Sequence, residues 1–288
     1  MTNMLCATYN IQYCKGKDGQ YDIDRIVAEL RDAHLIALQE VETHVARSGD
    51  VNQATEIAAR LPHMYWSFGP GIDADASKVV DGQVINKRRQ FGNMILSRWP
   101  LLSVTNHPLP KTALQGLVHS RRAMIEAVID TPLGPIRFAS VHFDHIGPST
   151  RLPQVAYAKG MLLNGPRHGA SWGGPFDDGW FDRPEPPMPA PVILMGDCNF
   201  APDSAEYDLM LGAISPQYGR VHEAHGLADA WVSAGHGEDE GVTIVHAGGS
   251  ARIDHCFATH DLARRVTKAW VDMEAQGSDH QPVFFEFT

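Results

Sequence analysis

Residues 192–199 read VILMGDCN, four apolar residues and a glycine followed by Asp197, Cys198 and Asn199. A short apolar run of this kind predicts a buried strand. Asp197 and Asn199 lie two residues apart, so their side chains point to the same side, while Cys198 points to the other and is expected to fill the core. The stretch therefore predicts a buried strand that delivers two polar side chains to the rim of a sheet.

Apolar or alternating runs predict further strands on both sides of this one. One run, residues 35–38, ends in Gln39 and Glu40, as a buried strand does when it reaches the rim of a sheet. A hairpin is predicted within residues 123–141, because the sequence TPLG at its centre supplies a turn. The other predicted strands cover residues 4–9, 93–97, 252–257, 266–272 and 282–287.

Three helices are predicted from apolar residues at helical spacing, over residues 23–30, 53–60 and about 153–163. Asp22 is the expected N-cap of the first helix. Ser149 or Thr150 is the expected cap of the third, with Pro153 near its first turn. The order of elements mixes crossovers with hairpins, which indicates an α/β fold.

Residues 165–191 hold five glycines and seven prolines, and we expect an irregular loop there. The loop carries large aromatic side chains, which suit a lid over the substrate or, alternatively, a satellite core or subunit contact. These side chains are Trp172, Phe176, Trp180 and Phe181. Apart from this insertion no repeat or linker is evident, so we expect one domain over residues 1–288.

The composition is that of an ordinary globular protein, with 43% hydrophobic and 20% charged residues. A net charge of -10 disfavours binding to nucleic acid through a basic face. No run of eighteen apolar residues and no basic stretch followed by an apolar core occurs, so a cytoplasmic protein is expected. The four cysteines have no CxxC spacing and are expected to be reduced.

Carboxylate and amide side chains fall at or just beyond the predicted strands. Each has an unremarkable interpretation of its own, such as a solvated strand end, a surface acid or a turn former. Six of them converging on one sheet edge would repel one another unless a divalent cation held them, and oxygen ligands suit Mg²⁺ or Mn²⁺. These residues are Asn10, Glu40, Asp197, Asn199, Asp254 and Asp279.

The run His142-Phe143-Asp144-His145 offers an alternative, a zinc site. We favour the harder ion, because histidines dominate the ligands of dinuclear zinc hydrolases and the other converging groups here are carboxylates and amides.

Seven short motifs, taken together and in this order, resemble the endonuclease/exonuclease/phosphatase superfamily. They are Thr8-Tyr9-Asn10-Ile11, Leu38-Gln39-Glu40-Val41, Gly92-Asn93-Met94-Ile95-Leu96-Ser97, Ser140-Val141-His142, Gly196-Asp197-Cys198-Asn199, Arg252-Ile253-Asp254-His255 and Ser278-Asp279-His280. The resemblance implies a four-layer α/β sandwich, two mixed sheets face to face with helices outside, and an active site at one rim of the pair.

On the family pattern the resemblance implies a metal centre in which Glu40 is the principal ligand, helped by Asn10. Asp279 would bind the same ion or a second one. His280 would act beside the scissile phosphate, held and polarised by Asp254.

The resemblance also implies contacts to the phosphate. Asp197 would orient the attacking water, and Asn199 would donate to a phosphoryl oxygen as charge develops. His142 would bond a non-bridging oxygen. Arg122 matches a position where arginine meets phosphate, although the adjacent Arg121 leaves this assignment open by one residue.

The implied chemistry is metal-assisted, in-line attack of water on a phosphoester. We expect an Mg²⁺- or Mn²⁺-dependent phosphodiesterase or phosphatase acting on a small or lipid-like phosphoester, with Trp172 and Trp180 at the substrate. The alternative is an endonuclease or exonuclease on DNA or RNA. The sequence leaves the exact substrate and the oligomeric state open.

Overall fold

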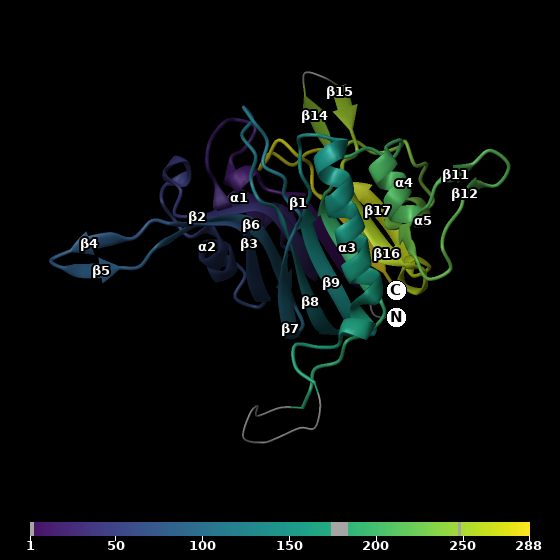
Figure 1. The fold of residues 1–288 in the computed structure, drawn as a ribbon, viewed down its shortest axis with the longest axis horizontal. Helices are drawn as coiled ribbons and strands as arrows, with labels where there is room; N and C mark the ends of the chain where they lie inside the picture. The colour runs from purple at the N-terminus through teal and green to yellow at the C-terminus, as the bar shows by residue number, and fades with distance from the viewer. Residues whose placement is uncertain (1–2, 174–183, 247–248) are drawn as a thin grey trace.

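The computed structural model describes residues 3–173, 184–246 and 249–288 (Figure 1). Two six-stranded mixed sheets pack face to face. The first has the strand order β17 (Val266–Val271), β18 (Val283–Phe287), β1 (Met4–Asn10), β2 (Leu35–Thr43), β6 (Arg88–Ser97), β3 (Tyr65–Asp75). The second has the order β13 (Leu227–Asp229), β16 (Asp254–Thr259), β10 (Val192–Asp197), β9 (Gly134–His142), β8 (Ala123–Thr131), β7 (Leu101–Pro108).

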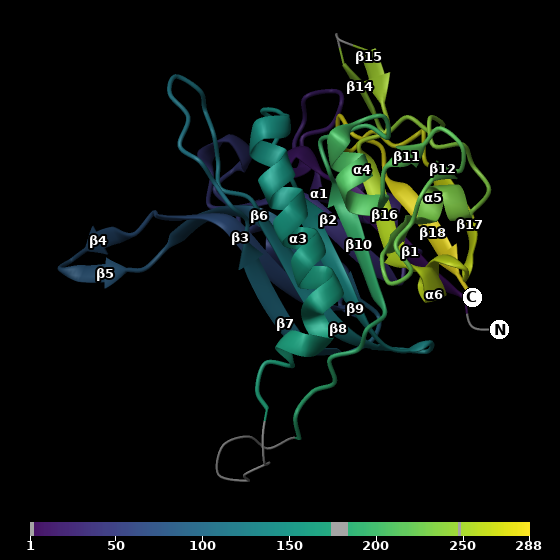
Figure 2. The ribbon, with the colours of Figure 1, turned by 45° about the vertical axis from the view of Figure 1, so that its right-hand side comes forward.

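Helices and three small hairpins complete the described structure (Figures 1 and 2). The helices are α1 (Ile23–Leu30), α2 (Gln53–Arg60), α3 (Pro148–His168), α4 (Ala205–Leu211), α5 (Ala230–Ser233) and α6 (His260–Ala263). The hairpins are β4 (Lys78–Val80) with β5 (Gln83–Ile85), β11 (Ile214–Ser215) with β12 (Gly219–Arg220), and β14 (Ile244–His246) with β15 (Gly249–Ala251). Of the helices described, none has the length and apolar character needed to cross a membrane.

The core has three layers, which follow from the alternation of side chains along the strands. In β1, Met4 and Cys6 face the other sheet, whereas Ala7 and Tyr9 face the helices α1 and α2. On the outer side of the second sheet, α3 and α4 pack over β9 and β10 through a third apolar cluster (Figure 2). The result is the predicted four-layer α/β sandwich.

Most predicted elements are confirmed. The helices α1 and α2 have the predicted bounds, and Asp22 caps α1 by accepting a hydrogen bond from the Arg25 amide. The predicted hairpin is formed by β8 and β9. Cys6, Cys14, Cys198 and Cys256 are all buried and free.

The third helix was predicted wrongly at both ends. The helix α3 begins at Pro148 with Gly147 at the N-cap, and it continues to His168, so the first residues of the expected irregular loop are helical. Pro153 therefore lies inside the helix and not in its first turn. The amide that Pro153 lacks would have bonded to the Ser149 carbonyl, and both residues are exposed, so water can take its place.

Candidate active site

Three neighbouring strands of the second sheet carry polar residues at the same level, at one edge of the sheet. Asp197, at the end of β10, is paired with His142 of β9 on one side and with Asp254 of β16 on the other. All three side chains are buried. The strand register thus lines up three of the predicted site residues at one end of this sheet.

The first sheet brings Asn10 and Glu40 to the same place. Asn10 ends β1, but β2 does not end at Glu40 as predicted, because it continues to Thr43. An extra residue between Leu38 and Val41 shifts the pairing with β6, and Glu40 has a φ of 60°. Such a bulge re-aims a side chain. Leu38 and Val41 both face the helices, and the bulge lets Glu40 lie next to Asn10 between the sheets.

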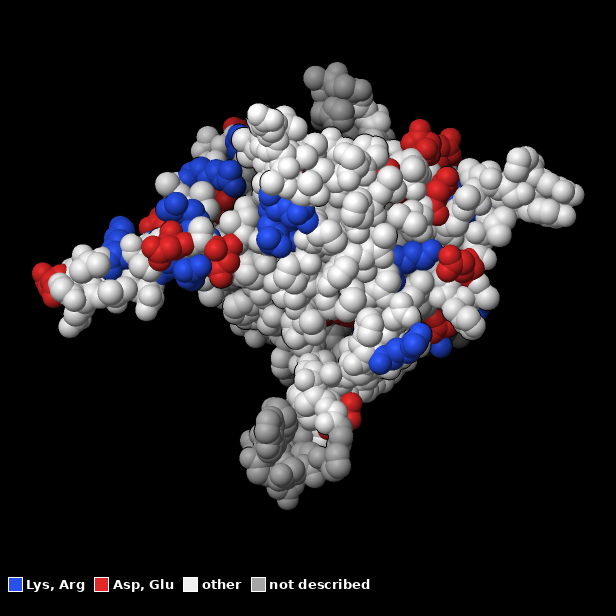
Figure 3. Space-filling model, viewed as in Figure 1, with Lys and Arg blue, Asp and Glu red and all other residues white. Residues whose placement is uncertain are grey.

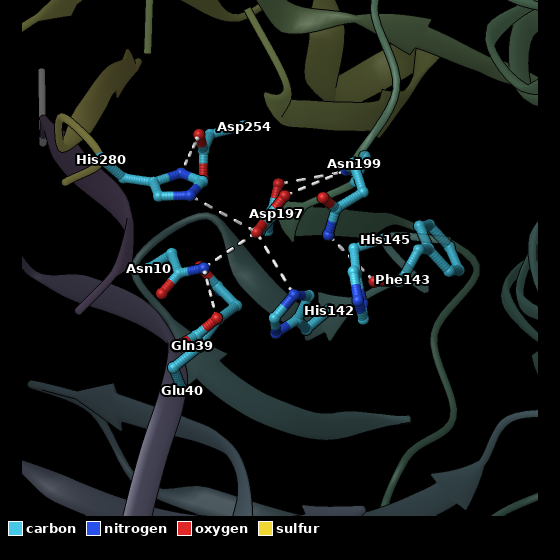
Figure 4. Close-up of polar contacts among 12 residues, drawn as sticks. Asn10, Gln39, Glu40, His142, Phe143, His145, Asp197, Asn199, Asp254 and His280 are labelled. Atoms are coloured by element: carbon cyan, nitrogen blue, oxygen red, sulfur yellow. Dashed lines mark hydrogen bonds and ion pairs between the residues drawn. The ribbon is translucent and has the colours of Figure 1, made fainter. Parts of the chain in front are cut away.

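Asp197 is at the centre of the site (Figure 4). Its Oδ2 atom accepts a hydrogen bond from Asn10 Nδ2 at 2.8 Å and lies 3.3 Å from His142 Nε2. The same oxygen is 3.8 Å from His280 Nε2. Its Oδ1 atom accepts a hydrogen bond from the backbone amide of Asn199 at 3.0 Å. Burial raises the pKa of Asp197 to about 7, with Asp254 and Glu40 adding to the rise and His280 and Asn10 opposing it.

Asp254 and His280 form a hydrogen-bonded pair, with His280 Nδ1 at 2.8 Å from Asp254 Oδ2. Burial alone would lower the pKa of His280, but Asp254 and then Asp197 overcome that effect and raise it to about 10. The ring is therefore an imidazolium at neutral pH, and its two N–H groups face the two carboxylates.

Two sets of residues could be considered for a metal ion. Asp197, Asp254 and His280 form the only group of three in the described ranges with ligand atoms within 4.8 Å of one another. Both ring nitrogens of His280 already face carboxylates, Nδ1 that of Asp254 and Nε2 that of Asp197, so this trio fits an acid–base pair beside a carboxylate better than a metal centre.

The predicted ligands fit a hard cation better. Glu40 is a carboxylate whose pKa is raised by burial, against the opposing effects of Asn10 and Arg122. Gln12 links Asp279 to Asn10. Its side-chain Nε2 donates to Asp279 Oδ2 at 2.6 Å, and its backbone amide donates to Asn10 Oδ1. An all-oxygen donor set of this kind suits Mg²⁺ or Mn²⁺. Asn10, however, turns its Nδ2 toward Glu40 and Asp197, so here it is a hydrogen-bond donor to both.

Arg122 does not point into the open part of the site. The residue is 7% exposed, and its guanidinium lies with Nη1 at 3.0 Å from His142 Nδ1 and Nη2 at 3.0 Å from His145 Nδ1. Burial and Arg122 hold the pKa of His142 well below its usual range. This guanidinium occupies the Nδ1 atom of each ring, and among the described residues the ligand atoms of the His142–His145 run do not come together as a group of three, which argues against the zinc alternative.

Asn199 lies next to Asp197 with its backbone at a φ of 53°. Its side-chain amide donates to the Phe143 carbonyl at 3.1 Å. The second N–H of that amide has no hydrogen bond within the described residues, so it remains available to a phosphoryl oxygen.

Several polar residues for which the sequence predicts no role support the site. Gln39 Nε2 donates to Ser140 Oγ at 3.0 Å, and this buried hydrogen bond joins the two sheets beneath Asn10 and Asp197. Both residues occur in the quoted motifs, so the signal was present. His119 pairs with the buried carboxylate of Asp144, a contact between loops that no sequence pattern indicates.

The structure does not bring the 165–191 segment to the site through its described ends. The helix α3 starts near His142 and runs 21 residues away from it, about 30 Å. β10 starts at the far end of the sheet and reaches Asp197 only at its last residue. Trp172 follows the end of α3 that is far from His142. The position of the segment between α3 and β10 therefore does not support a lid over the site. Phe176, Trp180 and Phe181 lie outside the described residues.

Comparisons with known proteins agree with this architecture. A sequence model of the Endonuclease/Exonuclease/phosphatase family matches residues 7–280. No curated protein sequence matches. The chain is similar to the solved endonuclease/exonuclease/phosphatase from Bacteroides vulgatus, with a TM-score of 0.67, 19% identity, and 100% of this chain and 99% of that chain covered.

Two further structures show the same fold. That from Beutenbergia cavernae has a TM-score of 0.64 and 19% identity, with 99% of this chain and 71% of that chain covered. The mannosyl-6-phosphatase of Bacteroides thetaiotaomicron has a TM-score of 0.62 and 18% identity, with 99% of each chain covered. The family match spans both sheets and every strand that carries a site residue, so the chain belongs to the endonuclease/exonuclease/phosphatase family.

Proposed function

We propose that this chain is a divalent-metal-dependent phosphoesterase that hydrolyses a small or lipid-like phosphoester by in-line attack of water. One observation carries the proposal. The buried carboxylate of Asp197 lies between the Asn10 amide, the neutral His142 ring and the His280 imidazolium, at the end of two facing sheets. Such a site can hold a water molecule beside a carboxylate and surround a phosphoryl group with hydrogen-bond donors.

The residues divide into a water-orienting group and a donor group. Asp197 accepts a proton from the water, and Asn10 and His142 hold its carboxylate in place. His280, kept protonated by Asp254, and the free N–H of Asn199 offer positive charge and a hydrogen bond to the phosphoryl oxygens.

The cation is assigned to Glu40 and Asp279, with Asn10 steadying the Glu40 carboxylate. When bound, a divalent ion there would neutralise charge that develops on the phosphoryl group. Mg²⁺ is the expected ion and Mn²⁺ the expected substitute, because both prefer oxygen ligands.

A small substrate is favoured over a nucleic acid by charge. The chain carries a net charge of -10, and in Figure 3 the Lys and Arg side chains form separate patches, interrupted by Asp and Glu, with no continuous basic band on that face. One of the proteins of similar fold is a mannosyl-6-phosphatase. This supports testing sugar phosphates alongside lipid phosphoesters.

The test is a substrate panel with Mg²⁺, with Mn²⁺ and with chelator. The panel comprises bis-p-nitrophenyl phosphate, p-nitrophenyl phosphate, sugar phosphates, phospholipids, plasmid DNA and single strands. We expect metal-dependent hydrolysis of small esters and a fall in kcat by orders of magnitude in Asp197→Asn and His280→Ala, with the double variant little worse than either single one. Full activity with chelator would contradict the metal assignment, and a clear preference for DNA or RNA would favour the nuclease alternative.

A further inference from the structure

Next to the Asp197 cluster, and sharing His142 with it, lies a second group of side chains organised by Arg122. Its guanidinium links His142 of β9 to His145, three residues further along. We propose that His145 is a substrate-contacting residue that presents a neutral Nε2–H donor to a phosphoryl oxygen, and that Arg122 is the positioning residue that fixes this form of the ring. The inference rests on the proposed phosphoesterase function and names an additional residue for it.

The form of the ring follows from the chemistry of arginine. A guanidinium has only N–H groups and accepts no hydrogen bond. An imidazole nitrogen 3.0 Å from an arginine Nη atom therefore carries no proton, and this applies to Nδ1 of both His142 and His145. A neutral imidazole has one proton, so in both rings that proton is on Nε2.

Arg122 has little freedom to move away. It directly precedes β8, it is buried, and its Nε atom has no hydrogen-bond partner among the described residues. The two Nη atoms use the two imidazoles as acceptors, so loss of either contact would leave more buried N–H groups unpaired. The planar guanidinium thus holds both rings side by side.

The backbone that carries His145 is equally well fixed. Asp144 is fully buried, accepts a hydrogen bond from the Ile146 amide at 2.7 Å, and pairs with His119 from the loop before Arg122. The Asp144 amide donates to Gln154 of α3 at 2.9 Å. His145 therefore follows a residue that is anchored through both its side chain and its backbone.

His145 itself is exposed, unlike the groups that hold it. Within the part of the chain that the structure describes, its ring makes no hydrogen bond besides that from Arg122, so Nε2 is free. Figure 4 shows the ring next to His142 and near Asn199, whose free N–H the proposed function assigns to the phosphoryl group. A fixed, neutral N–H group in that place is suited to an oxygen acceptor.

The charges around His145 agree with a neutral ring. Partial burial and then Arg122 lower the pKa of His145, and His119 and Arg151 act in the same direction. Asp144 opposes them. The carboxylate of Asp144 is already engaged by His119 and by the Ile146 amide.

The first experiment determines which nitrogen of the His145 ring carries the proton, and it does not depend on catalytic activity. Nitrogen-15 NMR of the full chain at pH 7.5 distinguishes Nδ1–H from Nε2–H imidazoles, and His145→Gln assigns the His145 signal by its disappearance. We expect His145 to be the Nε2–H form in the wild type and a mixture of forms in Arg122→Met. An Nδ1–H ring or a mixture in the wild type would overturn the proposal, even if Arg122→Met did not fold.

The second experiment uses substitutions at the exposed position, which should not affect folding. Glutamine can place an N–H near the position of Nε2, whereas alanine cannot. We expect kcat/KM for bis-p-nitrophenyl phosphate, and the affinity for inorganic phosphate measured by calorimetry, to fall about tenfold in His145→Ala, as the loss of one hydrogen bond implies. His145→Gln should stay within about threefold of the wild type.

The matched control is His225→Ala, an exposed histidine away from this cluster, which should change neither quantity. Equal losses in His145→Ala and His145→Gln, or no loss in either, would refute the substrate contact. An inactive wild type would instead contradict the proposed function, and the ring form and phosphate affinity would still decide the role of His145.

Discussion

His255 is a fully buried histidine whose two ring nitrogens are both in use. Arg252 Nη1 donates to His255 Nδ1 at 2.9 Å, and His255 Nε2 donates to the Phe200 carbonyl at 2.8 Å. Burial and then Arg252 lower the pKa of His255 to about 4. In the unfolded chain the ordinary histidine pKa of about 6.5 applies, so the folded state requires a neutral ring that the unfolded state does not.

We predict that this residue makes the protein less stable as the pH falls. Between about pH 6.5 and pH 4 the unfolded chain binds a proton that folded His255 does not, so its stabilising effect is complete above that window and is lost through it. From pH 7 to pH 5 the loss is about 2 kcal/mol. The measurement is the free energy of unfolding in urea at both pH values, for the wild type and His255→Gln.

The variant should lose about 2 kcal/mol less than the wild type between these pH values, because glutamine does not titrate. Every other titrating group is shared, so it cancels in the comparison. The same pH dependence in both proteins would show that His255 is not the group responsible.

Which site residues converge could be predicted from the sequence, but the roles of individual atoms could not. His142 and Asp197 end two strands and Asp254 begins the antiparallel strand beside them, and such strand ends meet at one edge of a sheet. The position of Glu40 depends on a bulge with a positive φ, which strict alternation of side chains does not predict. The contacts of Arg122 with His142 and His145 depend on how a loop before β8 packs against one after β9, which no local pattern records.

At the level of single elements, β9 and β10 approach each other closely just before the residues of the candidate site. A Cβ atom on Gly196 would lie 1.9 Å from the Val141 carbonyl oxygen, so only glycine fits this position of β10. The next residue is Asp197. The glycine thus allows the strand to place that carboxylate level with His142.

We predict that Gly196→Ala lowers the free energy of unfolding by about 3 kcal/mol, since the obstacle is backbone and cannot rotate away. The displaced Asp197 should also reduce kcat. Gly160→Ala in α3 is the matched control, because no atom lies within 4 Å of its Cβ position and alanine favours a helix by about 1 kcal/mol. Urea unfolding measures both variants, and equal stabilities would contradict the packing argument.

The elements themselves differ in how well sequence predicts them. The bounds of α1 and α2 are predicted correctly, and in the structure side-chain oxygens of Asp22, the predicted cap, and of Asn52 cap the two helices. The start of α3 was missed because Gly147 caps it without a side chain. The far end was missed because packing overrides the local preference: Gly165 lies against Arg137, which itself bonds to the Pro189 carbonyl at 2.7 Å.

At the scale of the whole molecule, metal binding should increase the free energy of unfolding. An ion that binds only the folded protein adds about 2.7 kcal/mol when its concentration is 100 times Kd. For a chain of this size we predict a rise in Tm of roughly 5 to 10 °C on adding Mg²⁺. Glu40→Gln should abolish most of the rise, while Glu274→Gln, an exposed carboxylate elsewhere, should retain it. If the rise in Tm persists in Glu40→Gln, residues other than Glu40 hold the ion.

The net charge of -10 belongs to the whole molecule and leads to a prediction about salt. A nuclease that neutralises six or more phosphates loses about a thousandfold in affinity between 50 and 200 mM salt, because bound counterions are released. A small phosphoester releases few ions, and an acidic protein repels it at long range, an effect that salt screens over about 10 Å. We therefore expect kcat/KM for bis-p-nitrophenyl phosphate at fixed Mg²⁺ to change less than about threefold over this range, and to rise if it changes.

The companion measurement uses a single-stranded oligonucleotide under the same conditions. If the oligonucleotide is the better substrate at low salt and its kcat/KM falls by a hundredfold or more at 200 mM, the chain acts on nucleic acid despite its charge. A flat response with the small ester preferred at every salt concentration is the result that the charge of this molecule predicts.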